Sequence, residues 1–441
     1  ATEHKEGHMM LTPGEEMAGF IDASPTQFHA AHNAAQRLVD AGFALFDPQE
    51  TADEQTPQEP GARFVVRDGA LIAWVDGTSP LGPLRMIGAH TDSPNLRIRP
   101  RPDTGLAGFQ QLGVEVYGGA LLNSWLDRDL GIAGRVALRS TQSAEAVEHR
   151  LFRSEGPQVR VPQLAIHLDR ELSERGLLLN KQTHMQPIWA LGNPHEGEFR
   201  AWLGNEMDCD PEQILGWDLA CFDVQPAAVL GRQAELLASA RLDNLCSSFG
   251  AVEALIAAKW AGHGPSVIVL YDHEEIGSTS ATGADSTWFS QVLEQRAAAL
   301  GASRSAFLGS LEGSVMLSAD MAHATHPNYS ERHEPNHWVH LGGGPVIKHN
   351  VNGRYATDSA TAGIFREVCH SLQVPVQEYS HRGDLPCGST IGPLAAAQLA
   401  VPTVDVGMAQ LSMHSIREVM AVADVELMIT AFTAWLSQTN S

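Results

Sequence analysis

Cysteine is scarce in this 441-residue chain, and the cysteines that are present form no pattern. There are five, an odd number, and no two of them have CxxC spacing. This pattern is typical of reduced thiols in the cytoplasm and disfavours a disulfide framework or a zinc site built from thiolates. No uninterrupted apolar run reaches the roughly 18 residues of a membrane span, and no secretory leader pattern is present. We therefore expect a globular, cytoplasmic protein without a membrane partner.

Positive charge is also scarce. Lys and Arg number 29 against 52 Asp and Glu, which gives a formal net charge of -23. Nucleic acids and anionic lipids are bound through basic surfaces, so the charge excludes both as partners. An acidic ligand would have to be bound by a local cation.

Several catalytic motifs are absent. Without a GxSxG elbow, Ser389 is expected to cap a helix, and Cys387 has no assigned base. The glycines before Pro345 lack both the lysine spacing of a phosphate loop and the GxGxxG pattern. A histidine-rich tract has no HExxH pattern and is interrupted by Pro327 and Pro335, so we expect most of its histidines to lie in loops. These histidines are His323, His326, His333, His337 and His340.

What the chain does contain is an alternation of short apolar runs and helical stretches. Such runs are typical of strands buried on both faces, and their alternation with helices predicts an α/β fold with a doubly wound mixed sheet and helices on both faces. The predicted strands are 84–89, 267–271, 314–319 and 403–406. The predicted helices are 24–41, 245–260, 287–300, 360–372, 391–399 and 422–435. A hairpin is expected at 63–75, with Gly69 supplying a positive φ in the turn.

The length predicts more than one domain, because single cores stop growing near roughly 250 to 300 residues. Residues 95–234 interrupt the alternation with glycine-rich, strand-like sequence. We interpret them as an inserted, mainly β second domain, and residues 10–94 with 235–441 as the catalytic domain. Residues 1–9 are interpreted as a remnant of an expression vector, so His4 and His8 are left out of the site.

Polar residues follow the predicted strands directly. His90 and Asp92 come after the first run, where the carboxylate could fix the tautomer of a histidine that binds a metal. Glu274 and Glu275 come after the next. Because successive side chains point in different directions, one of these carboxylates could bind a metal and the other act as a general base.

Three further residues occupy equivalent positions, namely Asp243, Asp320 and His414. Each has an ordinary interpretation, as a helix cap, a turn aspartate and a loop histidine. Their coincidence at strand ends favours a metal site, because function in such sheets lies beyond the carboxyl ends of the strands. A mixed set of nitrogen and oxygen ligands suits Zn²⁺, Mn²⁺ or Co²⁺, and one carboxylate can bridge two ions roughly 3.5 to 4 Å apart.

Eight motifs in order between residues 88 and 418 resemble those of the aspartyl aminopeptidase family of metallopeptidases. They are GAHTDSPNLRIRP, SARLDNL, DHEEIGS, SADMAHATHPNY, GGGPVIKHN, RYATDSA, GDLPCGSTIGP and MHSIRE. The resemblance implies a zinc-exopeptidase-like fold. It also implies two divalent ions, most simply Zn²⁺, one held by His90, Asp243 and Asp320 and the other by Asp243, Glu275 and His414.

The same resemblance implies the activity, namely hydrolysis of the peptide bond after an N-terminal aspartate or glutamate. A water bridged between the ions would attack, with Glu274 as the general base. His323, Lys348 and Tyr355 would contact the substrate. Residues 95–234 would form a dimer and then a tetrahedral dodecamer, in which His167 reaches a neighbouring active site.

Two alternatives remain open from the sequence. A carboxypeptidase or deacylase could use the same two-metal chemistry. A metal-binding but inert assembly subunit is the other, since such sheets also occur in proteins without activity. The adjacent Glu274 and Glu275 disfavour the inert subunit.

Overall fold

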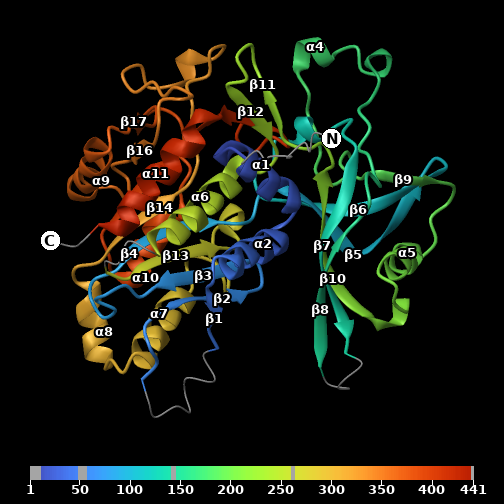
Figure 1. Ribbon diagram of the computed structural model, residues 1–441. Helices are drawn as coiled ribbons and strands as arrows, with labels where there is room; N and C mark the ends of the chain where they lie inside the picture. The colour runs from blue at the N-terminus through green and yellow to red at the C-terminus, as the bar shows by residue number, and fades with distance from the viewer. Residues whose placement is uncertain (1–10, 48–56, 141–145, 260–263, 439–441) are drawn as a thin grey trace, which may run out of the picture.

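A nine-stranded mixed sheet forms the centre of the larger body in Figure 1. The computed structural model describes residues 11–47, 57–140, 146–259 and 264–438. The sheet order is β1 (Ala44–Leu45), β2 (Ala62–Arg67), β3 (Ala70–Val75), β13 (Ser266–Tyr271), β4 (Arg85–His90), β14 (Val315–Ala319), β18 (Thr403–Gly407), β16 (Val346–His349) and β17 (Gln377–Ser380).

The middle of this sheet is parallel. Strands β13, β4, β14 and β18 run in the same direction, so their carboxyl ends meet at one edge. Every residue of these four strands is buried, as expected for apolar runs covered on both faces. They confirm the four strands predicted from the apolar runs. Antiparallel neighbours on both sides, β3 and β16, make the sheet mixed.

Helices cover both faces of the sheet and bury two separate apolar clusters. One face carries α1 (Pro13–Ala23), α2 (Gln27–Asp40), α6 (Leu242–Ala258), α9 (Ser359–Ser371) and α11 (Ala423–Ser437). The other carries α7 (Trp288–Ala299), α8 (Arg304–Leu311) and α10 (Ile391–Leu399). The predicted doubly wound architecture is therefore confirmed. The last predicted residue of the second helix, Trp260, lies outside the described residues, as do residues 1–9.

Two local expectations are wrong. In the β2–β3 turn it is Asp68, with φ 54°, that takes the left-handed conformation. Gly69 is needed for a different reason, because a Cβ there would lie 2.4 Å from Oδ2 of the buried Asp272. Helix α10 is capped by Thr390, whose hydroxyl accepts from the N–H of Gly392, and not by Ser389.

A six-stranded antiparallel sheet lies beside the larger body, at the right of Figure 1. It has its own apolar cluster, formed around Trp125 and Phe199. Its order is β8 (Val147–Arg153), β7 (Leu130–Arg139), β10 (Ile214–Asp223), β5 (Asn95–Leu106), β6 (Phe109–Tyr117) and β9 (Ile188–Leu191). The same part of the chain contains α4 (Leu172–Arg175) and α5 (Glu198–Glu206). All of these elements fall within residues 95–223.

A third, five-stranded sheet is not indicated by the sequence. Its order is β11 (Ala228–Leu230), β12 (Leu236–Ser239), β20 (Glu418–Ala421), β19 (Ala409–Leu411) and β15 (Ala322–His323). Strand β12 leads into the start of α6, and the turn between β19 and β20 contains His414. This small sheet therefore supports two of the loops that form the site.

None of the helices in the described ranges has the length and apolar character needed to cross a membrane.

Candidate metal centre

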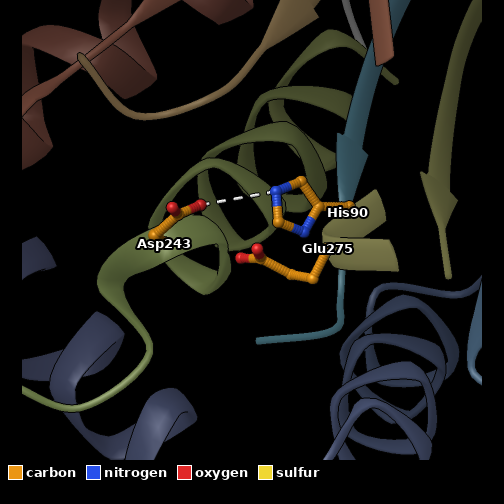
Figure 2. Close-up of side chains that lie close together, drawn as sticks. All are labelled: His90, Asp243 and Glu275. Atoms are coloured by element: carbon orange, nitrogen blue, oxygen red, sulfur yellow. Dashed lines mark ion pairs between the residues drawn. The ribbon is translucent and has the colours of Figure 1, made fainter. Parts of the chain in front are cut away.

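The carboxyl ends of the parallel strands and the small sheet bring the predicted ligands together. His90 is the last residue of β4, and Glu274 and Glu275 form a 3₁₀ turn after β13. Asp320 follows β14 directly, and Asp243 lies near the start of α6. Ligand atoms within 4.8 Å of one another define two overlapping groups, His90 with Asp243 and Glu275, and His90 with Glu274 and Asp320. Figure 2 shows the first group converging from α6, β4 and the 3₁₀ turn.

Asp243 lies between the two histidines. Its Oδ1 is 3.3 Å from His90 Nε2, and its Oδ2 is 3.4 Å from His414 Nε2. His90 Nε2 is also 3.7 Å from Asp320 Oδ1, and His414 Nε2 is 3.3 Å from Glu275 Oε2. Each oxygen of one carboxylate thus faces a different histidine, which is the arrangement that a bridging ligand requires.

Ring nitrogens on the far side of both histidines contact backbone carbonyls. His90 Nδ1 lies 3.0 Å from the carbonyl of Asp92, and His414 Nδ1 lies 3.1 Å from that of Gly119. When Nδ1 donates to a carbonyl, the lone pair of a neutral imidazole is on Nε2, directed at the carboxylates. The carboxylate of Asp92, expected to fix His90, is the more distant acceptor at 3.4 Å.

The donor set fits divalent cations. Asp243 Oδ1 and Glu275 Oε1 are buried and accept no hydrogen bond from the described residues, a costly state for carboxylate oxygens without a cation. Burial and neighbouring carboxylates raise the pKa of Glu274 to about 8, even though His90 opposes the shift. Burial acts against protonation of His414, but Asp243 and Glu275 raise its pKa to about 10. Both pKa values are raised because the buried carboxylates attract positive charge, which bound cations would supply.

Asp92 organises the turn that carries the two glutamates. Its Oδ1 and Oδ2 each accept a backbone N–H at 3.1 Å, from Glu274 and Glu275 respectively. Its Oδ2 also accepts from the hydroxyl of Tyr117 at 2.7 Å. Tyr117 belongs to β6 of the six-stranded sheet, and sequence reasoning missed it because the contact depends on how the two sheets pack.

Glu418 was also missed. It is 2% exposed and lies on β20, four residues after His414. Its Oε1 accepts the backbone N–H of His414 at 2.8 Å, and its Oε2 accepts that of Asp243 at 3.0 Å. The end of the MHSIRE motif was the only sequence signal for this residue.

A pocket of about 570 Å³ opens beside the carboxylates. It is lined by His323, Lys348 and Tyr355, the residues of the same subunit that are expected to contact the substrate. Its walls include Asp243, Glu274, Glu275, Asp320, His323, Lys348, Tyr355 and His414. Lys348 is 2% exposed, so it is not the ordinary surface lysine that its sequence alone indicates. Its Nζ donates to the carbonyls of Asp320 at 2.8 Å and Met321 at 3.2 Å, and lies 5.2 Å from the centre of the Tyr355 ring.

His167 does not line this pocket. It is exposed in the 3₁₀ helix Ile166–Leu168. The histidine-rich tract supplies His323 to the pocket, whereas His333 Nε2 accepts the N–H of His326 and His337 pairs with Glu334. In the described part of the chain, none of these histidines belongs to a group of three or more ligands.

The doubly wound sheet has the zinc-exopeptidase-like fold, and two histidines and four carboxylates converge beside the carboxyl ends of its parallel strands. Comparison with known proteins defines the family. The family model described as aminopeptidase I zinc metalloprotease (M18) matches residues 20–436. A probable M18 family aminopeptidase 2 of Streptomyces avermitilis is 46% identical over 428 residues, covering 96% of this chain and 97% of the relative. The chain belongs to the M18 family, the aspartyl aminopeptidase family, and is a metallo-aminopeptidase.

Solved structures agree with this assignment. A chain of the cryo-EM structure of the Ape4 and Nbr1 complex is 36% identical, with a TM-score of 0.91, and the match covers 96% of this chain and 85% of that one. The mApe1 dodecamer of S. cerevisiae is 27% identical, with a TM-score of 0.81, covering 96% and 97% of the two chains.

Proposed function

We propose that this protein is a dinuclear zinc aminopeptidase that removes aspartate or glutamate from the N-terminus of peptides. The observation that carries the proposal is the pocket itself, in which the ligand cluster, Glu274 and a buried lysine face one space. The residues that would hydrolyse the peptide bond and Lys348, which would bind an acidic side chain of the substrate, thus line the same pocket.

His90, Asp243 and Asp320 would hold one ion, and Asp243, Glu275 and His414 the other. The unpartnered oxygens of Asp243 and Glu275 support this assignment. Bound there, two divalent ions would lower the pKa of a water molecule and stabilise negative charge on the scissile carbonyl oxygen. Mn²⁺ or Co²⁺ would fit the same nitrogen and oxygen donors.

Glu274 is assigned as the general base. It accepts the proton of the attacking water and returns it to the amine of the leaving peptide. Asp92 accepts the N–H groups of Glu274 and Glu275, which fixes the turn so that the two carboxylates have separate tasks. Glu274 Oε2 lies 3.8 Å from His90 Nε2, so the base is beside the first ligand group.

Lys348 is assigned to the acidic side chain of the substrate. A lysine ammonium has three donors, and two of them are used by the carbonyls of Asp320 and Met321. The third can reach a carboxylate in the pocket, whose other walls include His323 and Tyr355. The surrounding protein and the charge of Lys348 lower the pKa of His323, so this imidazole is neutral and can donate or accept.

Self-association is part of the proposal. The segment around His167 exposes several large apolar side chains, and such a patch on a single subunit is typical of a surface that contacts another subunit. These are Leu164, Ile166, Leu168, Leu177 and Leu178. We assign residues 95–234 to dimerisation and the whole chain to a tetrahedral dodecamer, in line with the dodecameric mApe1, and place the protein in the cytoplasm. His167 would complete the pocket of a neighbouring subunit.

A panel of N-terminal amino-acid amides tests the function, with metal content measured on the same sample. Aspartyl and glutamyl amides should be hydrolysed fastest, in protein that contains two ions per subunit. Free and N-acetylated peptides provide the comparison with a deacylase. Cleavage of the acetylated peptide alone would overturn the proposal, as would an absence of hydrolysis in fully metallated protein.

A further inference from the structure

Glu418 connects the two loops that supply His414 and Asp243. Its two carboxylate oxygens accept one backbone N–H each, from His414 at 2.8 Å and from Asp243 at 3.0 Å. The side chain amide of Gln410 also approaches Oε1, at 3.4 Å. The ring of His414 pairs with Asp243 and Glu275, whereas Glu418 contacts the backbone N–H of His414.

The small sheet places Glu418 for this task. In the ladder between β12 and β20, Glu418 is opposite Ser239, four residues before Asp243. In the ladder between β20 and β19, Gln410 and Leu411 are paired with Met420 and Val419, which closes the loop that contains His414. One buried carboxylate therefore fixes the exit of β12 relative to the β19–β20 turn.

We propose that Glu418 is a positioning residue for the second metal ion, the one assigned to Asp243, Glu275 and His414. Two of these three ligands come from the loops that Glu418 joins. The first ion takes only Asp243 from them, because His90 and Asp320 end strands of the large sheet. Loss of the connection should therefore weaken the second ion more than the first. The inference depends on the ligand assignment of the proposed function.

The variant Glu418→Gln isolates this role, because it keeps the shape and removes one acceptor. A glutamine has a single carbonyl oxygen, and its NH₂ group cannot accept from an N–H. One loop would lose its partner and leave a buried N–H unsatisfied, so it would have to shift. Groups that orient metal ligands typically contribute about 10- to 100-fold in metal affinity, and we expect a loss of this size at one of two sites.

Glu378→Gln is the matched control. Glu378 is a partly exposed glutamate on β17 that pairs with His349 and Arg366, and it does not line the pocket. The control makes the same substitution, Glu to Gln, without touching a loop of the metal centre.

The experiment is a titration of the full-length, metal-free protein with Zn²⁺, monitored by calorimetry, with bound metal counted after dialysis. Wild type and Glu378→Gln should bind two ions, and Glu418→Gln should bind one with normal affinity and one about 10- to 100-fold more weakly. Unchanged affinity at both sites, or an equal loss at both, would overturn the proposal. If wild type itself bound no zinc, the proposed function would fail first, which keeps the two outcomes distinct.

A second readout covers poor folding of the glutamine variant. In Glu418→Asp, which keeps the carboxyl group but is one methylene shorter, amide hydrogen exchange of the Asp243 and His414 N–H groups should accelerate while β4 and β13 stay protected. Unchanged protection of both amides together with normal zinc binding would overturn the proposal. Equal acceleration throughout the sheets would mean that Glu418 stabilises the fold and not the ion.

Discussion

At the scale of single residues, Asp243 and Glu274 lie in one cluster but make different contacts. Asp243 faces both histidines, whereas Glu274 approaches His90 alone, at 3.8 Å. We expect Asp243→Ala to lose both ions and Glu274→Gln to retain them. The glutamine variant should lose about 10²- to 10⁴-fold in kcat, the usual effect of removing a general base. Metal analysis beside steady-state kinetics measures both effects. Near-normal activity of Glu274→Gln would contradict the mechanism.

Lys348 gives a prediction about selectivity. A charge-assisted hydrogen bond is worth about 1.5 to 3 kcal/mol, or a preference of roughly ten- to a hundredfold. Lys348→Met keeps the length and removes the charge, so kcat/KM for aspartyl and glutamyl peptides should fall by that factor. Asparaginyl and leucyl peptides should be cleaved slowly, as before.

The contacts of Lys348 with the carbonyls of Asp320 and Met321 provide the competing explanation. If the lysine mainly holds this loop, acidic and neutral peptides would lose activity equally, and metal content would fall. Such a result would mean that the acidic side chain is recognised elsewhere.

Some of these residues could be predicted and others could not. A buried parallel strand is a run of apolar residues, so the first polar residues after it fall at the functional edge of the sheet. His90, Asp320 and the two glutamates were found in this way. Glu418 and Tyr117 were not, because their roles depend on which loops and sheets lie beside them in space.

At the scale of secondary structure elements, the same contrast holds. The four central strands and all six predicted helices match the structure within a few residues. The five-stranded sheet was missed because its strands contain only two to four residues, too few for a periodic pattern. Helix α1 was missed although Thr12 and Glu15 form a capping box, a recognised sign of a helix start.

The exposed 3₁₀ helix around His167 gives a prediction at this scale. His167→Ala should lower activity although His167 does not line the pocket of its own subunit. Mixed oligomers of His167→Ala and Glu274→Gln subunits should recover part of the activity, because some sites then combine an intact Glu274 with an intact neighbouring His167. Mixing should be verified by native mass spectrometry. Mixed oligomers without recovery would argue against shared sites.

At the scale of the whole molecule, the metal-free protein should lose stability as pH rises. Burial and nearby carboxylates raise the pKa of Glu274 and of Glu418 to about 8, from an ordinary 4.5. Although burial opposes it, Asp243 and Glu275 raise the pKa of His414 from 6.5 to about 10. All three folded-state values exceed the unfolded ones, so the folded protein binds more protons, and this stability is lost between about pH 5 and pH 10.

Urea denaturation of chelated protein at pH 6 and pH 9 measures this loss. The midpoint should be lower at pH 9, and added zinc should reduce the difference because cations then replace the protons. A midpoint that stays constant or rises with pH in the metal-free protein would contradict the prediction.

The contact between Gly119 and His414 has a consequence for how far this enzyme can be shortened. Gly119 follows β6 of the six-stranded sheet, and its carbonyl lies 3.1 Å from the far ring nitrogen of His414. The hydroxyl of Tyr117, two residues earlier, reaches Asp92. Excising residues 95–234 to obtain a minimal hydrolase would thus free an imidazole to rotate and loosen the turn of the two glutamates. The metal centre and the six-stranded sheet are therefore not separable modules. We expect a shortened chain that lacks residues 95–234 to be inactive because the geometry of the site is lost.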